Sequence, residues 1–286
     1  MPRQSRIDAP GSLHHIICRG IERRKIFRNT ADRDDFVARL SRVVSDTETS
    51  CYAWAVMPNH FHLLLRTGSV LITTVMRRLL TGYASGFNRR HQRSGHLFQN
   101  RYKSILCQED PYLKELVRYI HLNPLRARIV KDLDGLDFYP YCGHNRIMGY
   151  TKEKERWQDT DFILAIFGAS MESARMKYRE FIESGVSMGR RPELTGGGLV
   201  RSAGGWGELK SMRRMRGHIK GDERILGDPD YVESVLHAAQ EHLDEKYRIR
   251  AKGYGFQDVL NRVSEIFDIA VEALILPCRS PRCVLA

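Results

Sequence analysis

The chain has 286 residues, of which 42% are apolar, and a formal net charge of +12. This length suits one large domain or two modest ones, and the apolar fraction is that of a globular protein with a buried core. No run of about 18 apolar residues occurs, so we expect no membrane-spanning helix and no secretory leader. The six cysteines form no CxxC pair, a pattern that fits neither a disulfide framework nor a zinc ribbon and favours a reducing cytoplasm.

Strand and helix patterns alternate through the first 130 residues. Segments rich in β-branched, aromatic or small apolar residues predict four strands, at 12–18, 50–57, 60–65 and 102–107. Helical spacing of apolar residues predicts three helices, at about 31–45, 70–88 and 111–123, the last of which ends before Pro124. This order predicts an α+β fold, a ferredoxin-like split βαβ antiparallel sheet with helices on one face.

The remainder of the chain has a mainly α-helical pattern. The clearest helical segments are 161–184, 231–247 and 256–276. Eight of the 23 glycines fall between 185 and 207, which predicts a flexible linker there. We therefore divide the chain into an N-terminal domain, a helical extension, a Gly-rich linker and a helical C-terminal region, with bounds 1–130, 131–184, 185–207 and 208–286.

The net positive charge is confined to the N-terminal domain. Residues 1–130 hold 22 Lys and Arg against 10 Asp and Glu, and between Thr49 and Gln108 no acidic residue occurs. A nucleic-acid partner explains this concentration, and a solvated basic face is the alternative. The side chains expected to contact phosphate are Arg23, Arg24, Arg77, Arg78, Arg89, Arg90, Arg93, Arg101 and Lys103. Four aromatic residues between them either stack on unpaired bases or pack in the core: Tyr83, Phe87, Phe98 and Tyr102.

Two histidines lie one residue apart in the strand predicted over 60–65. Alternate side chains of a strand share a face, so His60 and His62 lie roughly 7 Å apart on one side of the sheet. Such a pair can hold one divalent cation, and a pair of ordinary polar side chains is the alternative. By the same alternation, only one of His14 and His15 can face this site.

A tyrosine and an asparagine follow on the helix predicted over 111–123. Tyr119 and Asn123 are four residues apart and share a helix face, so an amide ligand from Asn123 lies one turn from the phenol. Packing of Tyr119 and helix capping by Asn123 is the other interpretation. Tyr112 is a rival nucleophile, although it has no asparagine four residues later. The remaining candidates for proton transfer or phosphate contact are His96 and His121.

Three segments together resemble a known family. Met57–Leu65, Gly95–Lys103 and Arg118–Ala127 are similar, in sequence and order, to the single-tyrosine HUH transposases of the insertion-sequence type, and most of all to the REP-associated tyrosine transposases. The resemblance covers about residues 8–130. It implies a ferredoxin-like catalytic domain, Mg²⁺ or Mn²⁺ bound by His60, His62 and Asn123, and Tyr119 as the nucleophile. It also implies single-stranded or hairpin DNA as the substrate and a nucleoid-associated location in a bacterial cell.

These parts predict an enzyme that cuts and rejoins single-stranded DNA through a 5′-phosphotyrosine intermediate. One phosphodiester is exchanged for another, so no nucleotide cofactor is needed. A phenol has an ordinary pKa near 10, and a cation on the scissile phosphate assists its attack. The main alternative is a catalytically silent DNA-binding regulator, and the next is a metal-dependent nuclease that uses water. The sequence leaves a homodimer open, and it suggests that 208–286 is a truncated DNA-binding domain.

Overall fold

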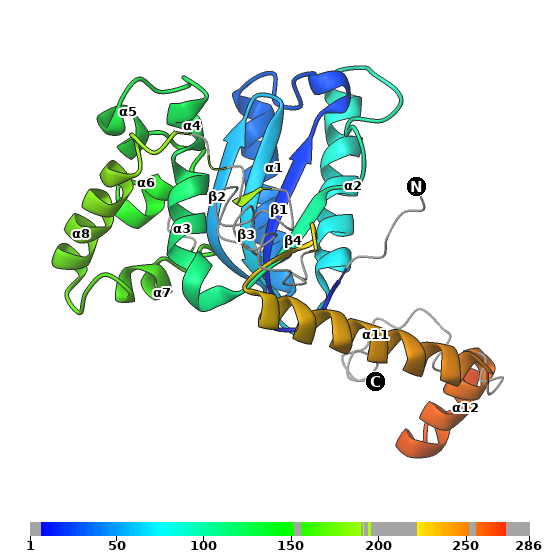
Figure 1. Cartoon of the computed structure of the whole chain (residues 1–286). Coiled ribbons are helices and arrows are strands. Elements are labelled where there is room, and N and C mark those ends of the chain that lie inside the picture. Colours follow the sequence, from blue (N-terminus) through cyan, green and yellow to red (C-terminus); the bar gives the residue numbers. More distant parts are fainter. Residues whose placement is uncertain are drawn as a thin grey trace, which may run out of the picture. The chain divides into compact units, whose positions relative to one another are not determined.

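The computed structural model describes residues 7–151, 156–189, 191, 194–195, 222–251 and 256–272. The chain divides after Val232 into two compact units. A five-stranded sheet forms the centre of the first unit (Figure 1). None of the helices among the described residues has both the length and the apolar character needed to cross a bilayer.

The sheet has the strand order β2-β3-β1-β4-β5. Its first four strands are antiparallel, and they are β1 (Leu13–Arg19), β2 (Ser50–Met57), β3 (His60–Arg66) and β4 (Lys103–Cys107). The predicted split βαβ arrangement is confirmed, because α1 (Thr30–Asp46) and α2 (Ile72–Arg90) connect these strands in the expected order. The sequence analysis missed β5 (Ile225–Leu226), which pairs with β4 in parallel.

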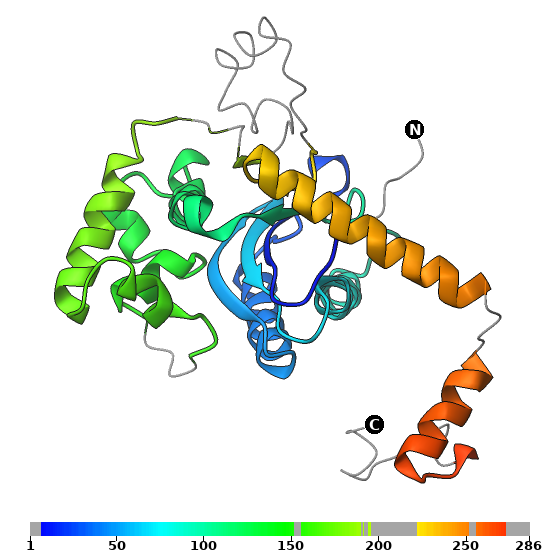
Figure 2. The ribbon, with the colours of Figure 1, turned by 60° about the horizontal axis from the view of Figure 1, so that its bottom comes forward.

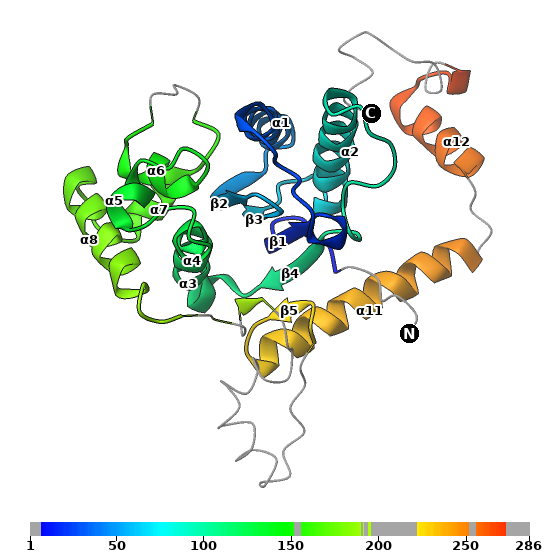
Figure 3. The same ribbon diagram turned by 90° about the horizontal axis from the view of Figure 1, so that it is seen from above.

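Both faces of the sheet are covered by helices. On one face, α1 and α2 pack against Ile16, Trp54 and Leu63. On the other face, α3 (Glu109–His121) packs against Leu64 and Ile105. Figure 3 shows α1 and α2 on one side of the strands and α3 with α4 on the other. The prediction that helices lie on one face therefore holds for α1 and α2 and is wrong for α3. The near-complete burial of β2 and β3 reflects this two-sided cover.

A helical extension follows α3 on the same side of the sheet. The short helix α4 (Asn123–Arg126) leads from α3 into it, and its members are α5 (Leu133–Asp137), α6 (Gly143–Met148), α7 (Thr160–Ala165) and α8 (Met171–Ser184). Figure 2 shows the helices of 133–184, in green, gathered on the side of α3 and away from α2. Pro124 follows the end of α3 and lies in the first turn of α4. Proline is tolerated there because a backbone N–H at this position would have no intrahelical acceptor.

The C-terminal region contains α11 (Pro229–Ala251) and α12 (Phe256–Phe267). The helices predicted over 231–247 and 256–276 are thus present, the first longer and the second shorter than expected. Most of the predicted linker, 185–207, and the basic stretch 212–220 lie outside the described residues.

Candidate functional site

The two histidines of β3 point to the sheet face that α3 covers. His60 and His62 lie on this face with ring centroids 5.4 Å apart, as the period of the strand predicts. Sheet register then adds neighbours from other strands. Arg19 is paired with His60, and Ile17 is paired with both His62 and Lys103. The face therefore carries two imidazoles with basic side chains on the adjoining strands.

Each imidazole has a defined partner at Nδ1. His60 Nδ1 lies 2.6 Å from Asn59 Oδ1, and His62 Nδ1 lies 3.0 Å from His15 Nε2. The Nε2 atoms of His60 and His62 have no hydrogen-bond partner among the described residues. Burial, aided by the nearby charge of Arg19, lowers the pKa of His60 to about 4. Burial and the neighbouring histidines hold the pKa of His62 well below its ordinary value. Both rings are neutral at pH 7, the form that binds metals.

Tyr119 projects from α3 toward these rings. Its ring meets His62 edge-on at a centroid distance of 5.8 Å and meets His15 in the same manner at 5.9 Å. The guanidinium of Arg126 lies 5.4 Å from the centroid of the Tyr119 ring. Four rings and one cation from β1, β3, α3 and α4 thus surround a single point of the sheet face.

Asn123 is both a cap and a candidate ligand. Its Nδ2 donates to the carbonyl oxygens of Tyr119 and Ile120 at 3.1 and 3.3 Å. Carbonyl oxygens only accept, so these bonds fix the orientation of the amide. The oxygen Oδ1 then has no hydrogen-bond partner within the described part of the chain. Capping, which the sequence presented as an alternative to metal binding, uses only the Nδ2 end of this amide and leaves Oδ1 as a candidate donor.

One cavity of about 850 Å³ joins these groups. His60, His62, Tyr119 and Asn123 all line it. No set of three His, Cys, Asp or Glu side chains in the described ranges is arranged to hold a metal ion. The candidate metal donors at this cavity are two imidazoles and one amide oxygen. The basic side chains that line the cavity are Arg19, Arg23, Arg101, Lys103, Arg126 and Arg191.

Comparison with known proteins assigns the N-terminal part of the chain. Residues 11–123 match the family model described as "Transposase IS200 like". This segment is an IS200-like transposase domain. Among solved structures, a REP-associated tyrosine transposase bound to a REP hairpin aligns with 16% identity over 56% of this chain and 93% of its own, with a TM-score of 0.43. A putative transposase from Deinococcus radiodurans aligns with 18% identity over 41% of this chain and 92% of its own, with a TM-score of 0.30. No curated protein matches the chain.

Seven of the nine basic residues predicted to bind DNA fall into two groups on the transposase domain. Arg23, Arg101 and Lys103 line the cavity. A second group lies on α2, which covers the opposite face, and comprises Arg77, Arg78, Arg89 and Arg90. Two of these are in ion pairs with α1, since Arg78 lies 2.6 Å from Asp46 and Arg90 lies 2.8 Å from Asp32.

The two remaining predicted arginines also contact the protein. Arg24 lies 2.8 Å from Glu22. Arg93 donates to the Asn88 amide and to the His96 carbonyl oxygen. DNA contact by these residues and by those on α2 stays a prediction.

Sequence analysis missed three cavity arginines, Arg19, Arg126 and Arg191. Of these, only Arg126 could have been predicted from local spacing, because it follows Tyr119 by seven residues, about two helical turns. Arg19 reaches the cavity through strand pairing, and Arg191 comes from beyond the helical extension. Arg191 is also paired with Glu115 at 3.2 Å, whereas no carboxylate of the described residues is paired with Arg126.

Several other candidates in the transposase domain are located away from the cavity. The four interleaved aromatic residues, Tyr83, Phe87, Phe98 and Tyr102, belong to the core under α2 rather than to a stacking surface. His14 faces that core, so the alternation of β1 turns His15 to the site. His121 is fully buried against Tyr178 and does not line the cavity. Tyr112 packs at the edge of the other core and also lies outside the cavity lining.

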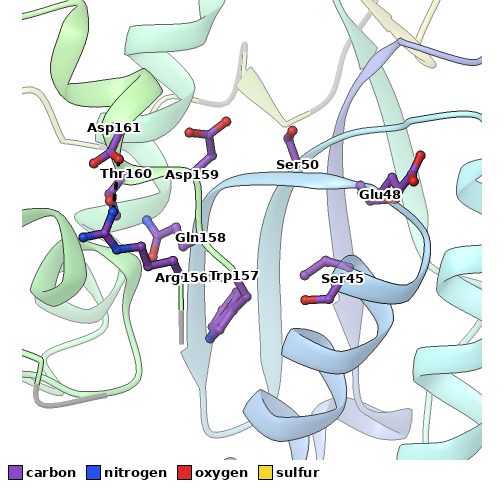
Figure 4. A pocket seen from close by; sticks show the side chains of 11 residues that line it. Ser45, Glu48, Ser50, Arg156, Trp157, Gln158, Asp159, Thr160 and Asp161 are labelled. Atoms are coloured by element: carbon purple, nitrogen blue, oxygen red, sulfur yellow. Dashed lines mark ion pairs between the residues drawn. The ribbon is translucent and has the colours of Figure 1, made fainter. Parts of the chain in front are cut away.

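A second, smaller cavity of about 360 Å³ lies where residues 156–161 run beside β2. Figure 4 shows Asp159, Asp161 and Glu48 around it, with Arg156 reaching toward Asp161 at 3.8 Å. Its acidic lining disfavours a DNA phosphate. Gln158 instead fastens this segment to the sheet, because its amide accepts from Trp54 Nε1 at 2.8 Å and donates to the Tyr52 carbonyl oxygen at 3.2 Å.

Proposed function

We propose that the chain is a single-tyrosine DNA strand transferase that cuts and rejoins single-stranded hairpin DNA. The observation that carries the proposal is the shared cavity, where a phenol, two neutral imidazoles and an amide oxygen with no hydrogen-bond partner among the described residues lie among basic side chains. The family of residues 11–123 supports the reaction class, because transposases cut and join DNA strands. Hairpin DNA is the substrate class that the family resemblance implies.

The donor set fits a divalent cation such as Mg²⁺ or Mn²⁺. His60 Nε2, His62 Nε2 and Asn123 Oδ1 would hold it, and all three are uncharged atoms with no hydrogen-bond partner among the described residues. Imidazole and amide oxygen donors suit Mn²⁺ and Mg²⁺ and leave coordination positions open. When bound, such a cation draws charge from the non-bridging oxygens of the scissile phosphate.

Tyr119 is the proposed nucleophile. Its phenolic oxygen attacks phosphorus and loses its proton as the new O–P bond forms. The bond from phosphorus to the 3′ oxygen breaks, and this oxygen takes up a proton to give a free 3′-hydroxyl. The product is a 5′-phosphotyrosine, and attack by a 3′-hydroxyl reverses the step to rejoin a strand. Arg23, Arg101 and Lys103 line the same cavity and would bind neighbouring phosphates.

A covalent-adduct assay tests the proposal. A labelled single-stranded hairpin oligonucleotide is incubated with protein and Mn²⁺ or Mg²⁺, then separated on a denaturing gel. We expect a protein–DNA band from the natural protein and from Tyr112→Phe, and none from Tyr119→Phe. An adduct that survives in Tyr119→Phe contradicts the role of Tyr119. Cleavage without any adduct indicates a nuclease that uses water, and binding without cleavage indicates a DNA-binding regulator.

A further inference from the structure

His15 occupies a position next to the candidate metal ligands that the proposed reaction leaves without a role. The side chain is fully buried on β1, and both ring nitrogens are within hydrogen-bond distance of a partner. Nδ1 lies 3.3 Å from the Leu194 carbonyl oxygen, and Nε2 lies 3.0 Å from His62 Nδ1. The His15 and His62 rings are stacked with centroids 5.2 Å apart and an angle of 28° between their planes.

The partners give these hydrogen bonds a direction. A carbonyl oxygen only accepts, so the bond to Leu194 requires a proton on His15 Nδ1. In a neutral imidazole the other nitrogen then has the lone pair, and His15 Nε2 must accept. The proton in the bond between the two histidines therefore belongs to His62 Nδ1. A neutral His62 with this proton has its own lone pair on Nε2.

We propose that His15 is a positioning residue that holds His62 in the tautomer whose Nε2 can bind a divalent cation. The inference rests on the proposed function, since it assigns His62 as a metal ligand. A proton on Nε2 would remove that lone pair and so prevent ligation. Hydrogen bonds of this kind to the second ring nitrogen orient metal-binding histidines and fix their tautomers.

The neighbouring His60 has an equivalent arrangement from a different source. Its Nδ1 lies 2.6 Å from the side-chain oxygen of Asn59, the residue just before it in the β2–β3 turn. His60 thus obtains its orienting acceptor from the adjacent residue, whereas His62 depends on a residue of β1 that is distant in sequence. The same tautomer results at both positions. Tyr119, the proposed nucleophile, also makes a T-shaped contact with His15, so it touches both rings of the stacked pair His15–His62.

Substitutions at His15 separate an acceptor role from simple packing. His15→Gln keeps an oxygen near the position of Nε2, whereas His15→Leu fills space without an acceptor. We expect Mn²⁺ affinity, measured by electron paramagnetic resonance or calorimetry, to fall roughly 10- to 100-fold in His15→Leu and to be largely retained in His15→Gln. His14→Leu is the matched control, because it makes the same change one residue away on the opposite face. Hairpin affinity in EDTA should stay unchanged in all three variants.

A measurement on the natural protein avoids dependence on a variant's folding. Long-range ¹H–¹⁵N spectra of histidine-labelled protein, without metal, report which nitrogen of His62 is protonated. We expect the proton on Nδ1, and a proton on Nε2 overturns the inference. Equal Mn²⁺ affinity in His15→Leu and the natural protein also overturns it, provided that His62→Ala loses binding. Absence of Mn²⁺ binding in the natural protein counts instead against the metal site of the proposed function, and the tautomer spectrum still decides the role of His15.

Discussion

The rings of Tyr119 and His62 form a T-shaped contact, with centroids 5.8 Å apart and ring planes inclined at 76°. The two residues come from α3 and β3, and no local feature of the chain links them. Their contact places a candidate nucleophile beside a candidate metal ligand on the sheet face that α3 covers. This relationship makes the dependence of the reaction on the histidine pair directly testable.

We predict that His60 and His62 act as a unit. His60→Ala and His62→Ala should each abolish the covalent adduct, and the double variant should be no worse than either single variant, because removing one ligand already removes the site. Single-turnover adduct formation with hairpin DNA measures this. His96→Ala, on the exposed loop after α2 and outside the cavity lining, is the control that keeps activity. Separate and additive losses from the two substitutions would argue against a shared cation.

Arg126 should assist the reaction through its position over Tyr119, the proposed nucleophile. Its guanidinium lies 5.4 Å from the Tyr119 ring centroid, and its buried Nε has no hydrogen-bond partner in the part of the chain that the structure describes. A fixed cation beside the reacting groups stabilises developing negative charge. We expect Arg126→Met to slow adduct formation at saturating DNA by roughly 100-fold. Arg126→Lys should recover part of this rate, and Arg128→Met should match the natural protein. A loss confined to DNA affinity would instead mark Arg126 as a binding residue.

Local periodicity accounts for what the sequence predicted of the site. The pairing of His60 with His62 follows from strand alternation, and that of Tyr119 with Asn123 follows from one helical turn. The His15–His62 contact follows instead from β1–β3 register, which one sequence does not specify. Sheet register likewise brings Arg19 beside His60.

The charge pattern likewise predicts only what is local in the sequence, and not which charged residues pair in space. The segment from Thr49 to Gln108 contains no acidic residue, so Arg78 and Arg90 appear unpaired in the sequence. Their partners Asp46 and Asp32 belong to α1, which packs beside α2. An acid-free segment therefore does not establish an acid-free surface, and the two groups of arginines need a functional test.

The salt dependence of DNA binding should distinguish these two groups. Arg101 lines the cavity and is exposed, whereas Arg78 is already paired with Asp46 at 2.6 Å. A protein–phosphate contact on single-stranded DNA contributes about 0.7 to the slope of log affinity against log salt concentration. We expect Arg101→Ala to reduce the slope by about that amount and Arg78→Ala to leave it unchanged. Titrations of Tyr119→Phe at several salt concentrations provide the slope without cleavage. Equal effects of the two substitutions would place α2 in the DNA interface.

His14 should make the fold sensitive to acid. Burial lowers its pKa to about 4, and the charge of Asp8 offsets this only in part. The unfolded chain therefore takes up a proton near pH 6.5 that the folded chain refuses, so stability is lost as the pH falls from about 6.5 to about 4. Between pH 7.5 and pH 5 this single group should account for about 2 kcal/mol. Denaturant unfolding at both values should show a smaller loss in His14→Gln. His96→Gln, at an exposed site, should lose as much as the natural protein.

A buried chain of polar groups should hold the helical extension against α3. Tyr178 of α8 has its hydroxyl 2.7 Å from His121 Nδ1 and 2.9 Å from His144 Nδ1, and His144 Nε2 is 2.7 Å from Asp137. Asp137 accepts a hydrogen bond from the N–H at His144 Nε2. In a neutral imidazole, His144 Nδ1 then accepts a hydrogen bond from the Tyr178 hydroxyl, and the oxygen of that hydroxyl accepts one from His121 Nδ1.

The hydroxyl of Tyr178 thus serves two buried partners at once. Tyr178→Phe leaves both nitrogens unpaired in the core, and we expect a loss of about 2 kcal/mol in unfolding free energy. Chemical denaturation measures this loss, and Tyr150→Phe, at an exposed position, is the matched control. Adduct formation well below the melting temperature should be unaffected, because these hydrogen-bonded side chains lie outside the cavity lining. An adduct rate that falls in Tyr178→Phe while stability is retained would show that these hydrogen-bonded side chains influence Tyr119 through α3.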